Sequence, residues 1–411
     1  MLLQKIFLLL SDKFSVTKHE IEDLFDIESG NNDLIIFQTI ENRFDSVLHA
    51  KFLAMYLEHL SLINYKNFEA DQFDFDSSIN CLVGRNGAGK TTILDAIYHL
   101  AFTKSYFNPQ STQNVRHGAE LFTLEGKFKI DQRDLDLFVG FKKGTKKTVK
   151  LNSKTYDRIS DHIGKIPLVI ISPADRDLIS EGSETRRKFI DSIISQSDSG
   201  YLNALLKYNQ ALSQRNSLLK YFSKNNVFQK DTLALYDELL IENGSIIFEK
   251  RNQFLNFFSE HFIEQYQAIS PVESEVVEVK YDSELLKTDF KTLLEQSLSK
   301  DRLLQYTSTG IHKDDLMLLL NGYPIKKFGS QGQQKSFLIA LRFAQYAFLK
   351  NQKNQKPIVL LDDIFDKLDD QRVMRLVALV ENDFFGQLFI SDTNSSRTEE
   401  VVKATGRPYV I

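Results

Sequence analysis

The chain has 411 residues, of which 42 % are hydrophobic and 26 % are charged, and its formal net charge is −4. These values predict a globular protein of about two or three domains. No apolar run is long enough to span a membrane, and the apolar residues 1–10 lack the flanks of a signal peptide. The single cysteine, Cys81, excludes an intrachain disulfide, and we expect a cytoplasmic protein.

The first 54 residues differ from the rest of the chain. They carry the whole excess of negative charge, so residues 55–411 are neutral overall. Any DNA-binding surface must then be a local patch of positive charge. We expect residues 1–54 to be either an N-terminal extension, with partial helix around His19 to Asp26, or an artefact of the choice of start codon. The functional module is expected to begin at Met55.

A glycine-rich motif follows a short apolar stretch at residues 79–83 and precedes an amphipathic helical pattern. It fits the P-loop pattern G-x-x-x-x-G-K-[ST] and consists of Gly84, Arg85, Asn86, Gly87, Ala88, Gly89, Lys90, Thr91 and Thr92. Glycines let backbone N–H groups approach phosphate oxygens, and the N-terminus of a helix adds partial positive charge. The motif predicts binding of a nucleoside triphosphate such as ATP; the alternative is a tight strand-to-helix turn.

Two side chains of this motif have distinct expected roles. Lys90 would reach the β- and γ-phosphates, and the hydroxyl of Thr91 would hold Mg²⁺. The complementary carboxylates follow a second apolar stretch, residues 358–361. Asp362 would bind Mg²⁺, and Asp363 would orient the attacking water. The alternative is that both aspartates merely cap or turn the end of a strand.

A second helix start lies upstream of these aspartates, at residues 328–335. It resembles the S-x-G-Q signature of ABC-type ATPases through Ser330, Gly332 and Gln333. In that class, the signature of one subunit contacts the γ-phosphate held by the other, so the resemblance implies an ATP-dependent homodimer with Ser330 at the contact. Asp369 matches the position of the D-loop, a second dimer contact. The alternative is an ordinary helix cap.

The resemblance implies an α/β fold: an ABC-type ATPase head whose P-loop mixed sheet carries an antiparallel β subdomain and is interrupted by a helical arm. We expect ATPase segments at 55–174 and 306–411. The arm would occupy 175–305, because Leu202, Leu205, Leu212 and Leu219 repeat with helical spacing. A second helix is predicted from roughly Leu233 to Phe262. The two helices together would form a hairpin, which would either be such an arm or pack inside a helical subdomain.

The interval between Lys90 and Asp362 is longer than in transporter ATPases and shorter than in SMC proteins. This interval and several further segments resemble the RecF family of DNA-repair ATPases. The resemblance covers nearly all of 55–411. These segments are residues 56–68, 172–175, 181–191, 201–220, 309–316 and 321–322. Three departures are Glu184 in place of proline, the sequence of residues 366–369, and Ser391-Asp392-Thr393 where transporters keep a switch histidine.

The RecF resemblance implies a function in recombinational repair and replication-fork maintenance. ATP would drive pairing of two subunits on gapped DNA, slow hydrolysis would release them, and the partners RecR and RecO would help to load the recombinase. Two local clusters are candidates for contacts to DNA phosphates. They are Lys142, Lys143, Lys146 and Lys147, continued by Lys150 and Lys154, and Arg186 and Arg187 with Lys188.

Each cluster also has a structural explanation: a solvated hairpin for the lysines, and attachment of a helix to the ATPase lobe for the arginines. Three other functions have less support in the sequence. An SMC-like head would need a long coiled coil, which the sequence does not show. A transporter ATPase would not need the helical insertion, and a nuclease would need an acidic metal-binding domain in addition.

Overall fold

The computed structural model describes residues 53–131, 133–270, 272, 274–364, 373–375, 378 and 384–410. These belong to one compact unit, Leu53–Ile411. The helix expected around His19 to Asp26 and the D-loop aspartate, Asp369, lie outside the described residues. The predicted fold class is confirmed, since parallel and antiparallel sheets combine with helices in this unit.

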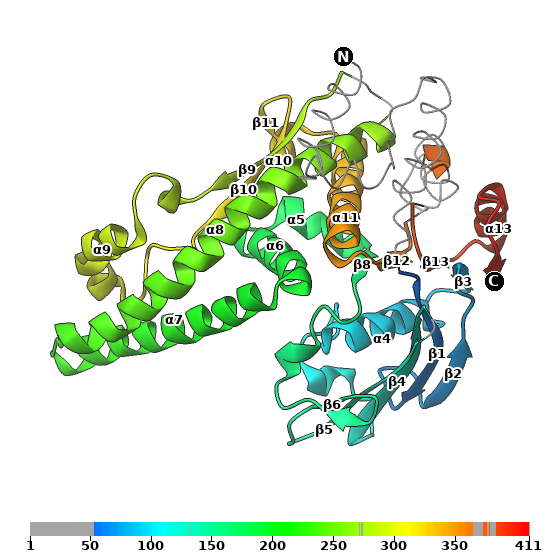
Figure 1. Ribbon diagram of the computed structural model, residues 1–411, viewed down its shortest axis with the longest axis horizontal. Helices are drawn as coiled ribbons and strands as arrows, with labels where there is room; N and C mark the ends of the chain where they lie inside the picture. The colour runs from blue at the N-terminus through cyan, green and yellow to red at the C-terminus, as the bar shows by residue number, and fades with distance from the viewer. Residues whose placement is uncertain are drawn as a thin grey trace, which may run out of the picture. The chain divides into compact units, whose positions relative to one another are not determined.

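A six-stranded antiparallel sheet forms the part of the unit predicted as an antiparallel β subdomain (Figure 1). In spatial order its strands are β2 (Ala70–Asp74), β1 (Met55–Ile63), β4 (Leu121–Ile130), β5 (Arg133–Lys142), β6 (Thr148–Leu151) and β7 (Lys154–Thr155). Residues with left-handed backbone form the turns of this sheet. Gly144 has a φ of 79° after β5, and Asn152 and Ser153 have φ of 46° and 65° after β6.

A five-stranded parallel sheet carries the ends of the nucleotide-binding motifs. Its spatial order is β14 (Tyr409–Val410), β3 (Ile79–Val83), β13 (Leu388–Asp392), β12 (Ile358–Asp362) and β8 (Leu168–Ile171). Strand β12 is buried on both faces: Ile358 and Leu360 enter one hydrophobic core, and Val359 and Leu361 enter the other. This explains why its sequence is continuously apolar rather than alternating.

The P-loop helix α4 (Lys90–Phe102) packs against strands of both sheets. Residues such as Leu94, Ile97 and Leu100 are fully buried in the core that the two sheets share. Helix α11 (Gln331–Lys353) packs on the other core, together with the helical hairpin. The two helices that begin at the phosphate-binding motifs are therefore held by different cores.

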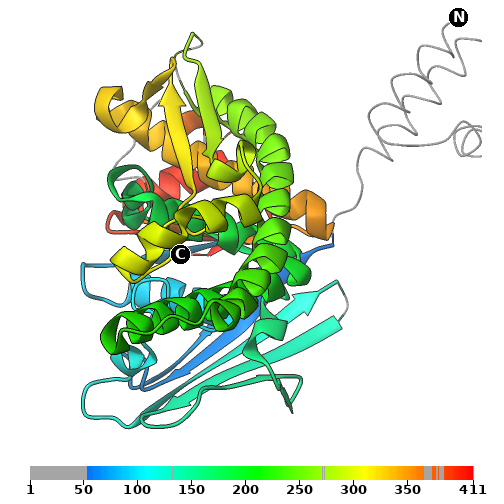
Figure 2. The ribbon, with the colours of Figure 1, turned by 90° about the vertical axis from the view of Figure 1, so that its left-hand side faces the viewer.

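The helical hairpin consists of α7 (Ser199–Asn225) and α8 (Lys230–Ile269), which lie side by side (Figures 1 and 2). The remaining helices are α5 (Asp177–Ser180), α6 (Ser183–Ser197), α9 (Phe290–Leu304), α10 (Ile325–Phe328), α13 (Ser395–Ala404) and the 3-10 turns Ser111–Asn114, Ile159–His162, Pro173–Arg176 and Glu284–Leu286. Of the helices described, none combines the length and apolar character that crossing a bilayer would require.

The segment predicted as helical arm is interrupted by a strand. Strand β9 (Val277–Asp282) pairs antiparallel with β10 (Asp315–Leu320), which pairs with β11 (Tyr323–Pro324). The helical expectation for 175–305 was wrong at β9, because a short strand that pairs with a distant partner gives only a weak local signal.

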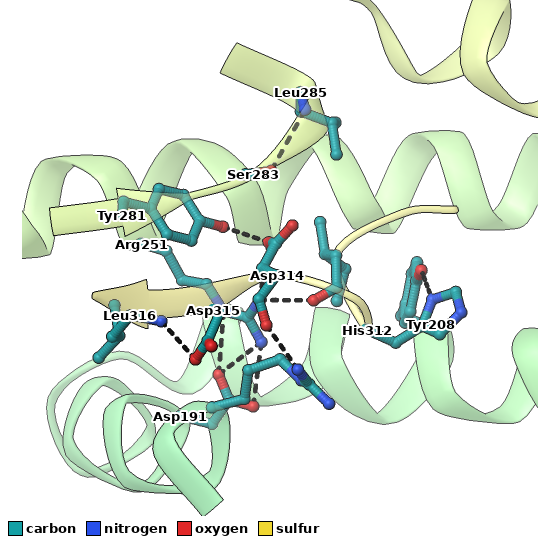
Figure 3. A network of polar contacts seen from close by, with 12 residues as sticks. Asp191, Tyr208, Arg251, Tyr281, Ser283, Leu285, His312, Asp314, Asp315 and Leu316 are labelled. Atoms are coloured by element: carbon teal, nitrogen blue, oxygen red, sulfur yellow. Dashed lines mark hydrogen bonds and ion pairs between the residues drawn. The ribbon is translucent and has the colours of Figure 1, made fainter. Parts of the chain in front are cut away.

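A buried network of charges fastens the hairpin to its neighbours (Figure 3). Arg251 of α8, 1 % exposed, pairs with Asp191 of α6 at 2.9 Å and with Asp314, next to β10, at 3.1 Å. The hydroxyl of Tyr201 donates to Asp191 at 2.5 Å, and that of Tyr281 donates to Asp314. Burial opposes the charge of Arg251, but the surrounding carboxylates, Asp191 first, hold its pKa well above the usual value.

We expect Arg251→Met to lower the free energy of unfolding by about 3–5 kcal/mol, because it leaves two carboxylates buried without their cation. Urea denaturation followed by circular dichroism measures the loss. The control is Lys250→Met at the next position, where the ion pair to Asp198 is partly exposed and contributes about 0–1 kcal/mol. Equal losses in the two variants would contradict the structural role of the network.

Candidate nucleotide-binding site

The predicted P-loop connects β3 to α4 as an exposed turn. Gly87 and Gly89 have φ of 84° and 104°, a backbone region that residues with a Cβ rarely adopt. A Cβ at Gly89 would also lie 2.5 Å from the ring of Phe68, which follows β1. Arg85, Asn86, Gly87 and Ala88 are exposed. The local sequence therefore gives the open, glycine-dependent loop that a phosphate requires.

The side chain of Lys90 folds across this loop and is largely buried. Its Nζ donates hydrogen bonds to the carbonyl oxygens of Gly84 at 2.7 Å and Arg85 at 3.1 Å. The neighbouring Thr92 hydroxyl donates to Asn67 at 2.7 Å, so the segment after β1 also supports the start of α4. Within the described part of the chain, the ammonium group of Lys90 is thus held at the loop by neutral carbonyl oxygens.

The two predicted Mg²⁺ ligands come together at the carboxyl edge of the parallel sheet. The Oγ1 of Thr91 donates to Oδ1 of Asp362 at 3.0 Å, and the hydroxyl of Ser391 donates to the same oxygen at 2.7 Å. This follows from the strand order, since β13 lies between β3 and β12. Hydroxyl and carboxylate oxygens are the ligands that Mg²⁺ prefers, so the residues present fit this ion.

Asp363 follows directly, with a φ of 48°, and its backbone N–H donates to the hydroxyl of Ser391 at 3.0 Å. It borders a cavity of about 350 Å³ that also involves the first turn of α11 through Gln331 and Gln334. Ser391 thus bonds to both adjacent aspartates. From the sequence, Ser391 was identified only as part of the segment where transporter ATPases keep a switch histidine.

Asp392, which follows Ser391 at the end of β13, holds the edge of the sheet in place. Its backbone carbonyl accepts from the N–H of Gly84 at 3.3 Å, which ties β13 to the P-loop. Burial works against the negative charge of its carboxylate. The hydrogen bonds from Arg397, the backbone of Asn394 and Thr398 outweigh burial and hold the pKa of Asp392 below its usual value.

The predicted signature begins helix α11 and is separate from the P-loop. Ser330, which is exposed, caps the helix: its hydroxyl accepts from the N–H of Gln333, whose side chain accepts from the N–H of Ser330. Gly332 lies in the same turn. The amide of Gln333 also donates to Glu275 at 2.7 Å, a contact that the sequence did not suggest. Within the described residues, no hydrogen bond joins these three signature residues to the P-loop.

The two candidate DNA-binding clusters are placed differently. Lys142, Lys143 and Lys146 are exposed at the turn between β5 and β6, whereas Lys147 is partly buried and donates to the carbonyl of Thr103. Arg186 and Arg187 make internal contacts, as follows: Arg186 pairs with Asp315 at 2.6 Å, and Arg187 donates to the carbonyl of Asp314. These are the contacts expected if the arginines attach α6 to the lobe.

The model of the family described as RecF/RecN/SMC N terminal domain matches residues 56–407. The chain is 57 % identical to the DNA replication and repair protein RecF of Flavobacterium johnsoniae, over 87 % of this chain and 99 % of the relative. It is 44 % identical to the RecF of Phocaeicola vulgatus, over 87 % and 96 %.

Solved structures give a similar result. The structure described as the recombination mediator protein RecF-ATP in the RecFOR pathway matches with a TM-score of 0.79 and 30 % identity, over 85 % of this chain and 94 % of that one. An Smc head domain from Pyrococcus furiosus matches with a TM-score of 0.50 and 18 % identity, over 85 % and 92 %, which shows a shared fold.

We expect Gly89→Ala to weaken binding of a nucleoside triphosphate by about tenfold or more, because the left-handed backbone costs an L-residue ~1–2 kcal/mol and the new Cβ meets Phe68. Fluorescence titration with a labelled nucleotide measures the affinity. Gly182→Ala is the control, since a Cβ there has no neighbour within 4 Å. Wild-type affinity in Gly89→Ala would show that the loop does not need its glycine.

Proposed function

Because the chain belongs to the RecF family of DNA replication and repair proteins, we propose that it is an ATP-switched DNA-binding protein that works as a homodimer. ATP binding pairs two copies at gapped DNA or at junctions of single- and double-stranded DNA, and slow hydrolysis releases them. Partners of the RecR and RecO type then help to load the recombinase. The fold and the family support this role, and the site geometry suggests which residues perform it.

In this proposal, Gly84 to Thr92 hold ATP. Lys90 exchanges its two carbonyl contacts for phosphate oxygens, a favourable exchange because the ammonium group bonds more strongly to a negatively charged oxygen than to a neutral carbonyl. Thr91 and Asp362 hold Mg²⁺, which when bound neutralises phosphate charge. Asp363 orients the attacking water, and Ser391 keeps both aspartates in place through its two hydrogen bonds.

The observation that carries the homodimer is the division of the site. The P-loop, Thr91 and Asp362 meet at one edge of the parallel sheet, whereas the capped helix start at Ser330 is exposed and bonded to Glu275 through Gln333. An exposed helix N-terminus can bind an anion, including one carried by another subunit. We infer that Ser330, Gly332 and Gln333 of one copy contact the nucleotide held by the other, with Asp369 at the same interface.

The described hairpin favours this role over that of an SMC-like head. Its helices have 27 and 40 residues and are joined by the short segment 226–229. At 1.5 Å per residue, the shorter helix is about 40 Å long, which is far from a long coiled-coil arm.

We expect Lys90→Met to weaken ATP binding by about ten- to a hundredfold, because charge-assisted hydrogen bonds contribute ~1.5–3 kcal/mol each. Lys90→Arg keeps the charge and should bind ATP but hydrolyse it poorly. Nucleotide titration and phosphate release measure the two steps separately. Normal turnover by the methionine variant would refute the role of this lysine.

We expect Ser330→Arg to bind ATP as a monomer with nearly wild-type affinity and to lose ATP-dependent pairing, because the added side chain would stand where the signature contacts the nucleotide held by the second copy. Light scattering with and without ATP measures pairing. Ser217→Arg, at an exposed position of α7, carries the same substitution away from the signature and should pair normally. An intact ATP-dependent dimer of Ser330→Arg would count against the proposed interface.

A further inference from the structure

A second cavity, of about 400 Å³, shares Asp175 with the cavity beside Asp363 but is not lined by the P-loop, Asp362 or Asp363. It is bounded by the C-terminal end of α4, the edge strand β8 and helix α6. Apolar side chains of Tyr98, Phe102 and Phe189 form part of its wall, and Lys104 and Lys188 line it as well. Neither lysine belongs to the nucleotide-binding motifs.

Two lysines from separate segments line this cavity, and a third lies next to it. Lys104 follows α4, and Lys188 stands on α6. Lys147, from the segment between β5 and β6, donates to the carbonyl of Thr103 and so lies beside Lys104. Burial and the charge of Lys188 lower the pKa of Lys104. Burial and the charge of Lys104 lower the pKa of Lys147 to about 8. Lys104 is therefore close enough to both Lys188 and Lys147 for like charges to repel.

The surrounding acidic groups do not balance this charge. Asp175 lines the cavity, but it is engaged by Arg342 in a buried ion pair. Glu184 pairs with Lys188 at 2.6 Å, yet both side chains are more than 70 % exposed, and such surface pairs contribute little. Asp177 is the other carboxylate on the wall. With Asp175 neutralised by Arg342, the three lysines exceed the two remaining carboxylates by one positive charge, and such a charge favours an anionic ligand.

We propose that this cavity is a binding site for a backbone phosphate of DNA, held by Lys104, Lys147 and Lys188. The inference rests on the proposed function and gives its DNA contact a location. A polymer is favoured over a free nucleotide because the positive charge continues past the cavity. Lys142, Lys143 and Lys146 stand exposed on the same β5–β6 turn that carries Lys147.

The site also joins the two clusters that the sequence singled out. Lys147 comes from the hairpin cluster and Lys188 from the cluster on α6, while Lys104 lies between them and was missed. Arg186 and Arg187 contribute by fixing α6 against Asp315 and the carbonyl of Asp314, which positions Lys188 rather than contacting DNA.

The test compares binding of a fluorescent gapped duplex to the full chain and to Lys104→Gln, Lys147→Gln and Lys188→Gln, with ATP, across a series of salt concentrations. Each lost phosphate contact should weaken binding and lower the slope of log K against log salt by about 0.9. Lys224→Gln removes the same charge at an exposed position near the end of α7 and should keep the wild-type slope. Thermal melting checks that each variant is folded.

The outcomes separate the two proposals. A wild-type protein whose DNA binding ignores ATP would contradict the proposed function itself. If the wild type binds with ATP but the three variants keep its affinity and slope, the cavity is not a DNA site and this inference fails. Titration of the same variants with labelled ATP distinguishes DNA from a free nucleotide as the ligand of the cavity. Variants that bind DNA more weakly but keep their ATP affinity support a DNA phosphate. Variants that lose ATP affinity but keep DNA binding contradict the proposal.

Discussion

The hydrogen bond between Thr91 and Asp362 joins two motifs that stand 271 positions apart in the chain. It exists because the parallel sheet places β13 between β3 and β12, so that all three strands end at the same edge. Ser391 at the end of β13 completes the arrangement by bonding to Asp362 and to the backbone of Asp363. The phosphate-binding loop and the acidic strand end gain their relation to each other only through this sheet order.

The same arrangement links the nucleotide edge to the lysine cavity. Asp175 borders both cavities and is held by Arg342 of α11. The hydroxyl of Tyr106 also donates to Asp175 at 2.8 Å, and the backbone N–H of Tyr106 donates to Asp95 of α4 at 2.7 Å. Helix α11 is therefore joined to Asp175 directly by an ion pair, and helix α4 is joined to it through Tyr106. These buried contacts connect the proposed ATP and DNA sites.

Much of this could be predicted from the sequence where the signal is local. The P-loop, the apolar strand ending in Asp362 and the α7–α8 hairpin depend on spacing within a few residues, and the structure has each of them. Strand β9 was missed because its partner β10 lies beyond a helix, so pairing rather than local propensity decides its conformation.

The parts of the candidate site that were missed are long-range contacts between ordinary polar side chains. Ser391 reaches Asp362, and Glu275 accepts from Gln333, without any pattern in the intervening sequence. Lys104 could not be predicted as a site residue, because an isolated lysine forms no motif with its neighbours in the sequence. Its meaning depends on Lys188, which lines the same cavity, and on Lys147, which the folded chain places beside Thr103 at the edge of that cavity.

The central claim is that each nucleotide site is shared between two copies of the chain. It is tested most directly by mixing donor-labelled Lys90→Met with acceptor-labelled Ser330→Arg and measuring energy transfer with ATP. Neither variant should pair with itself, yet the mixture contains one complete site, formed by the P-loop of one copy and the signature of the other. ATP-dependent energy transfer in the mixture alone is the predicted result. Its absence, under conditions where wild-type protein pairs, would contradict the account.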